Sequence, residues 1–115
     1  MRKLESQMVK AIETKNNWSG GNTSVSYNPD TDSSFVTLHG NLIAEVGLNH
    51  PRPVIRLYDG NHQSVTTKSR LNAILETFGL ENERVFAKNF DWKLMIRTQF
   101  GEVYDIPFFS GMRLA

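Results

Sequence analysis

The sequence predicts an α+β fold: a single domain with an antiparallel sheet of five to six strands and two helices packed on one face. Two segments repeat apolar residues at the spacing of an amphipathic helix, and other segments alternate apolar and polar residues as half-buried strands do. Short turn-rich connections separate most of the strand-like segments, which favours hairpins and therefore an antiparallel sheet. The chain has 115 residues, a usual length for one domain, so residues 1–115 are treated as one unit.

The second helix, over residues 66–78, is the best-specified element. An apolar stripe runs along it, formed at i, i+3, i+4 and i+7 by Leu71, Ile74, Leu75 and Phe78. Thr66 or Thr67 is expected to cap its start. Gly79 is expected to end it in the left-handed conformation, with Leu80 folding back onto the last turn.

The other elements follow from the same periodicities. A first helix is predicted over residues 2–14, with Leu4, Met8, Ala11 and Ile12 on one side and charged residues, Glu5 among them, on the others. Gly40 and Asn41 are expected to form a type II′ hairpin turn between strands. The predicted strands are 23–27, 35–39, 42–46, 54–58, 91–97 and 103–106. A short strand at 63–65 leads into the second helix, and residues 85–90 are expected to be extended.

Composition excludes several kinds of protein. The chain has no cysteine, which excludes disulfides, thiolate catalysis and cysteine-based zinc sites and suits a cytosolic protein. No apolar run is long enough for a transmembrane helix, and the polar start lacks a signal-peptide core, so no membrane association is expected. The net charge of +1 is low for a dedicated duplex-DNA binder.

No catalytic or metal-binding pattern stands out. His39, His50 and His62 lack the spacing of zinc ligands, and no nucleophile motif accompanies them. Residues 30–34 lack the glycine and glutamate that complete a calcium loop. We therefore expect a non-enzymatic protein without a metal or cofactor, whose histidines are ordinary surface or hydrogen-bonded residues.

Two segments together predict an anion site. The start of the second helix offers free N–H groups and positive side chains that call for an anionic counterpart, and the loop at 18–23 combines an aromatic ring with two glycines. The candidate ligands of a phosphate or nucleotide are Trp18, Asn22, Thr66, Thr67, Lys68 and Arg70. The alternatives are ordinary helix capping and a tryptophan that closes the edge of the core.

A third segment, residues 88–93, interleaves basic and aromatic residues as single-strand binders do. Lys88, Trp92 and Lys93 are its candidate nucleic-acid ligands. The competing interpretation places Phe90 and Trp92 together in the core, since they share one face of a strand.

The chain resembles a group of small uncharacterised proteins of tailed bacteriophages. The resemblance rests on residues 17–23, 38–44, 66–75 and 88–92, together with Pro107-Phe108 and Gly111-Met112. The family pattern has one glycine after the serine, so Gly21 lengthens that loop here. The resemblance implies a phage protein acting in the host cytoplasm and carries no reaction chemistry.

These observations favour a phage accessory protein that acts by binding, with a counter-defence role suggested by analogy with other small phage proteins. The expected partner is a host protein or a small anionic nucleotide, and a homo-oligomer would be natural for so small a binder. A nucleic-acid-binding module and a purely structural or regulatory protein are the alternatives.

Overall fold

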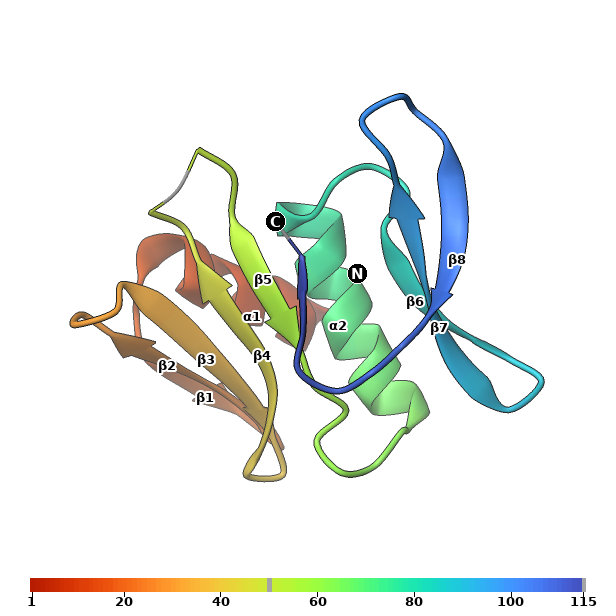
Figure 1. The fold of residues 1–115 in the computed structure, drawn as a ribbon. Helices are drawn as coiled ribbons and strands as arrows, with labels where there is room; N and C mark the ends of the chain where they lie inside the picture. Colours follow the sequence, from red (N-terminus) through yellow and green to blue (C-terminus); the bar gives the residue numbers. More distant parts are fainter. Residues whose placement is uncertain (50, 115) are drawn as a thin grey trace.

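The computed structural model describes residues 1–49 and 51–114, so the prediction for His50 lies outside the described residues. Two helices and nine strands follow one another along the described chain (Figure 1). Their order is α1 (Lys3–Thr14), β1 (Trp18–Gly20), β2 (Thr23–Asn28), β3 (Ser33–Leu38), β4 (Asn41–Gly47), β5 (Val54–Leu57), α2 (Val65–Phe78), β6 (Arg84–Lys88), β7 (Asp91–Arg97), β8 (Val103–Pro107) and β9 (Met112–Leu114).

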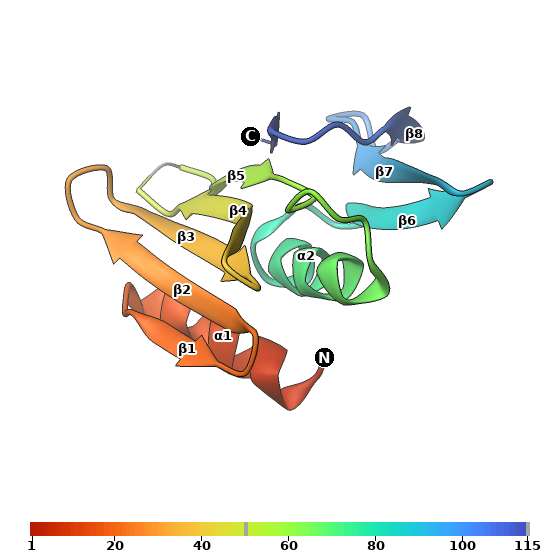
Figure 2. The same cartoon turned by 90° about the horizontal axis from the view of Figure 1, so that it is seen from below.

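The strands form two antiparallel sheets. The larger has the order β1-β2-β3-β4-β5-β9, and the smaller is the meander β6-β7-β8. Both helices lie on the same side of the larger sheet (Figure 2), so the predicted α+β class and helix placement are confirmed. The sequence predicted one sheet, whereas the chain after α2 builds a second one before β9 returns to pair with β5.

One core joins both helices to both sheets. α1 contributes Met8 and Ile12, and α2 contributes Leu71, Ile74 and Leu75, all at most 1% exposed. The sheets contribute the inward-facing residues of their strands, among them Val36, Ile43, Val46, Ile55, Leu57, Val85 and Leu94. The apolar stripe predicted for the second helix is therefore the face that packs on the core, with Phe78 partly buried beside it.

Both ends of α2 differ from the prediction. Ser64, not Thr66 or Thr67, is the N-cap, and its Oγ accepts a hydrogen bond of 3.1 Å from the Thr67 N–H. Gly79 has φ −81° and is extended rather than left-handed. A glycine fits there for reasons of space, because a Cβ at this position would lie 2.7 Å from the Leu75 carbonyl oxygen.

Two other local predictions are wrong. Residues 63–65 form no strand, because α2 already begins at Val65. The β3–β4 turn has His39 and Gly40 at its centre, with φ of 52° and 78°. Two positive φ values define a type I′ turn, so the register is shifted by one residue from the predicted type II′ turn.

Asn72 of α2 holds the smaller sheet against the helix. Its side-chain amide donates to the Val85 carbonyl at 2.9 Å and accepts from the Val85 N–H at 2.7 Å. The amide thereby pairs with the edge of β6 as a neighbouring strand would. This contact fixes the start of β6 against α2.

Candidate functional site

Arg70 is buried in a polar network between the two helices. Arg70 is 5% exposed, and its Nη1 lies 2.7 Å from Oε2 of Glu5, which is itself 3% exposed. Ser69 donates to the same carboxylate oxygen at 2.6 Å, and Arg70 Nε donates to Thr23 Oγ1 at 3.0 Å. The anionic counterpart that the sequence called for is thus supplied to Arg70 by Glu5 of α1.

The network also reaches the loop before β2. Arg70 Nη2 donates to Asn22 Oδ1 at 3.5 Å, so the two predicted anion-binding segments do meet. Burial alone would raise the pKa of Glu5, but hydrogen bonds from Ser69 and Arg70 hold that pKa below its usual range. Among the described residues no buried side-chain N or O atom lacks a partner, so the network is a closed structural connection.

The other predicted anion ligands lie apart from this network. Trp18 folds over Gly20, where a Cβ would lie 2.6 Å from the indole, and lines a hollow against α1. Thr67 is buried and shares a 2.9 Å hydrogen bond with the hydroxyl of the cap Ser64. Thr66 and Lys68 are half-buried on the first turns of α2. An anion site at Trp18, Asn22, Thr66, Thr67, Lys68 and Arg70 stays a prediction.

The structure separates the predicted nucleic-acid ligands. Trp92 is 7% exposed and packs edge-on against Phe108, with ring centroids 5.2 Å apart. Lys88 and Lys93 lie on the opposite, outer face of the β6–β8 sheet, since side chains alternate along each strand. Phe90 was expected to share the core with Trp92, but it sits in the β6–β7 turn with φ 68° and is fully exposed.

The histidines whose structure is described sit in exposed turns. His39 occupies the β3–β4 turn and His62 the connection before α2. Within residues 1–49 and 51–114 no three His, Asp or Glu residues lie close enough together to hold a metal ion. Neither helix of that part of the chain is long and apolar enough to cross a membrane.

A composite concave feature lies around Leu80, after the C-terminal end of α2; we call it the Leu80 cleft. It consists of three adjoining hollows of about 440, 220 and 390 Å³, and Leu80 lines all of them. Their walls come from α2, the 80–83 turn, the segment before β5, the C-terminal strand and the β7–β8 turn. The lining residues used below are Arg52, Leu75, Glu76, Leu80, Glu81, Glu83 and Arg84.

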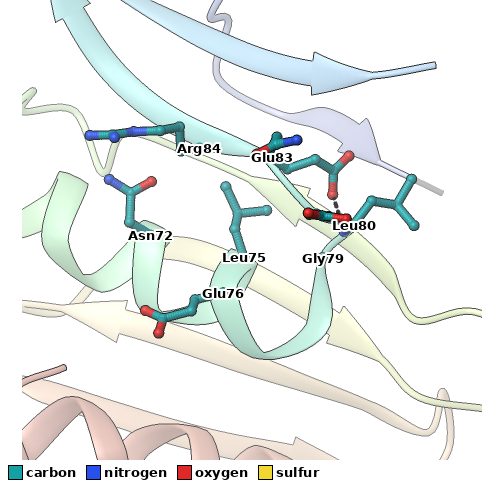
Figure 3. Close-up of a pocket in the computed structure, with 9 residues that line it drawn as sticks. Asn72, Leu75, Glu76, Gly79, Leu80, Glu83 and Arg84 are labelled. Carbon is teal, nitrogen blue, oxygen red and sulfur yellow. Dashed lines mark hydrogen bonds between the residues drawn. The ribbon is translucent and has the colours of Figure 1, made fainter. Parts of the chain in front are cut away.

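Glu83 fixes the shape of the turn inside this cleft. Its Oε1 accepts a 2.6 Å hydrogen bond from the Leu80 N–H, as Figure 3 shows, and its N–H donates to the Leu80 carbonyl. Burial raises the pKa of Glu83, an effect that the Leu80 N–H and the charge of Arg52 oppose. A carboxylate held half-buried in a cleft wall is a group that a positively charged ligand would stabilise.

Sequence reasoning missed this cleft and the role of Glu5. Residues 80–84 are mostly polar, and the apolar Leu80 among them is the one local signal of a contact. Arg52 stands between Pro51 and Pro53, a stiff setting suited to presenting a side chain. Glu5 was assigned to the solvent side of its helix because periodicity does not reveal a buried ion pair between distant segments.

Comparison with known proteins places this small α+β chain among bacteriophage proteins. A family model described as "Kyanoviridae Gp96 protein" matches residues 1–115, so the chain belongs to this family of cyanophage proteins. The resemblance to phage proteins is thereby confirmed. No curated protein and no solved structure matches the chain.

Proposed function

We propose that this phage protein is a non-enzymatic accessory protein that binds a host protein in the cytoplasm of the infected bacterium. The observation that carries the proposal is the Leu80 cleft. Its hollows combine apolar walls with a few charged groups, as binding sites do. They are open and contiguous, which suits an extended protein segment better than a small enclosed substrate.

The charges of the cleft favour a partner segment with a basic side chain. The 440 Å³ hollow is lined by three glutamates and one arginine. Glu81 is paired with Arg97 at 2.6 Å, whereas neither Glu76 nor Glu83 forms an ion pair with another described residue. The hollow also borders the C-terminal end of α2, whose last turn has no basic residue and whose dipole attracts cations.

A host defence protein is the partner that we propose, because small phage accessory proteins without catalytic motifs commonly act on host systems. The proposal is made by analogy. A small anionic nucleotide is the less supported ligand, since Arg70 already has Glu5 as its partner.

The Leu80→Asp variant tests the cleft. We expect at least a tenfold loss of affinity for the host protein captured from infected cells with the tagged wild-type protein, because the new charge lies inside the apolar part of the site. Affinity is measured by calorimetry with the purified partner. Glu83→Gln should weaken binding at neutral pH. It should also make affinity less dependent on pH, since the wild-type carboxylate becomes neutral as pH falls through its raised pKa and the glutamine does not titrate.

Val65→Asp is the matched control. Val65 is an exposed apolar residue at the opposite end of α2, 71% exposed against 36% for Leu80. We expect Val65→Asp to bind as the wild type does. Equal binding by Leu80→Asp and Val65→Asp would contradict the proposal. Infection of hosts that carry or lack the captured protein tests the counter-defence role.

A nucleic acid is the second candidate partner, favoured by the outer face of the β6–β8 sheet. Four basic residues and two acidic residues share that face with the half-buried ring of Phe86. By strand alternation the charged residues are Arg84, Lys88, Lys93, Arg97, Asp91 and Asp105. A basic sheet face with an aromatic ring resembles the surfaces that hold single strands.

Charge reversal separates this candidate from the first. If the outer face binds nucleic acid, the Lys88→Glu/Lys93→Glu variant loses single-strand binding in gel retardation, and the wild-type affinity falls steeply with salt. Lys3→Glu/Lys10→Glu, which makes the same change of charge on exposed positions of α1, should bind normally. Absence of retardation of the wild type at low salt would exclude nucleic acid.

A further inference from the structure

Strand β8 is the open edge of the smaller sheet. It ends the order β6-β7-β8 and lies at the rim of the molecule, with β7 on its inner side (Figure 1). The other edge of that sheet packs beside α2, and there the Asn72 amide bonds both backbone groups of Val85 on β6. Natural proteins usually protect such an edge or use it for pairing.

The backbone groups that point away from β7 can be assigned. The Thr98 N–H donates to the Glu102 carbonyl at 2.8 Å, and the Phe108 N–H donates to the Trp92 carbonyl at 3.1 Å. Because bonded and non-bonded pairs alternate in an antiparallel ladder, the even-numbered residues of β8 face β7. Val103, Asp105 and Pro107 therefore turn their peptide groups outward, and proline alone brings no N–H.

We propose that β8 pairs with β8 of a second copy of this chain, antiparallel and about a twofold axis at Tyr104. In this register Val103 lies opposite Asp105 of the second copy, and the two residues exchange both backbone hydrogen bonds on each side of the axis. Pro107 falls opposite Gly101 of the second copy, so little is lost through its missing N–H. The pairing joins the two small sheets into one of six strands.

Charge and the missing N–H of Pro107 favour the register with its axis at Tyr104 over the register with its axis at Asp105. An axis at Asp105 would set two aspartates directly opposite each other, which is unfavourable. It would also place Pro107 where the Val103 carbonyl needs a donor. With the axis at Tyr104, Asp105 faces Val103 and Glu102 faces Ile106 of the second copy, and two tyrosine rings meet at the centre.

Exposed aromatic residues at both ends of β8 support a self-complementary interface. Phe100 before the strand and Phe109 after it are 80% and 62% exposed, and Tyr104 between them is 50% exposed. Antiparallel pairing brings Phe100 beside residues 108–109 of the second copy. These three side chains leave about 400 Å² of aromatic surface per copy in water. Burial of this surface would supply about half of the roughly 800 Å² per partner of a standard interface.

The Asp105→Pro variant tests the pairing by light scattering coupled to size-exclusion chromatography. We expect a dimer for the wild type at tens of micromolar and a monomer for Asp105→Pro, because proline removes an outward N–H without touching the ladder to β7. Asp105→Ala keeps that N–H and should remain dimeric. A monomeric wild type, or a dimeric Asp105→Pro variant, would overturn the proposal.

Cysteine cross-linking gives a second readout that does not depend on tolerance of proline. The chain has no cysteine, so one introduced thiol reports one position. Tyr104→Cys places two thiols opposite each other on the axis and should form a disulfide dimer on mild oxidation. Val103→Cys leaves its two Cα atoms about 8 Å apart, beyond disulfide reach, and should not. Equal cross-linking of both variants would show that the register is not the one proposed.

Discussion

The Arg70→Met variant is expected to lose about 3–5 kcal/mol of unfolding free energy, because removing one partner of a buried ion pair leaves the other charge uncompensated. The charge left behind is Glu5, 3% exposed and 2.7 Å from the guanidinium in the wild type. Thr23 loses its hydrogen bond from Arg70 as well. Urea unfolding followed by circular dichroism at neutral pH measures the loss.

The Glu5→Met/Arg70→Met double variant is the control for this interpretation. Since both charges are gone, we expect it to be more stable than either single variant, as happens when apolar residues replace a buried pair. If the two single losses simply added, the pair would not be coupled, and the loss in Arg70→Met would reflect packing alone.

The same pair gives stability a defined dependence on pH. The folded-state pKa of Glu5 lies below its ordinary value of 4.5. Between these two pKa values the folded state therefore binds fewer protons than the unfolded state. The contribution of Glu5 to stability is therefore complete above about pH 4.5 and is lost as pH falls through the lower folded-state pKa. Glu5→Gln should flatten this part of the stability profile.

Local sequence patterns predicted the helices and strands well, but they predicted contacts between distant segments poorly. The apolar stripe of α2, the α1 helix and the alternation along β7 are encoded in neighbouring residues, and the structure has all three. The burial of Arg70 depends on Glu5, 65 positions away. Helical and strand periodicity relate only residues that are close in the sequence, so they do not predict this pair. The sequence therefore predicts an anion site at the start of α2, although Arg70 is paired with Glu5 inside the protein.

The Leu80 cleft escaped prediction for a related reason. Its walls come from segments that are distant in the sequence and meet only in the fold. Arg52 precedes α2 in the sequence and Arg97 follows it, yet both line the same hollow. The extended Gly79 was predicted to be left-handed because glycine after a helix usually is. Here the glycine is required by the closeness of the Leu75 carbonyl and the Glu83 carboxylate, a contact that arises only when the turn closes.

The Trp92→Ala variant is expected to lose about 3–5 kcal/mol of unfolding free energy, the usual cost of deleting a large core aromatic. Trp92 is 7% exposed and packs edge-on against Phe108, which follows β8. Phe90→Ala is the matched control: Phe90 is two positions away, fully exposed, and should change stability by no more than about 0.5 kcal/mol. Thermal and urea unfolding of the two variants therefore distinguish a core tryptophan from a surface stacking platform. A platform would leave Trp92→Ala as stable as Phe90→Ala and would cost only nucleic-acid affinity.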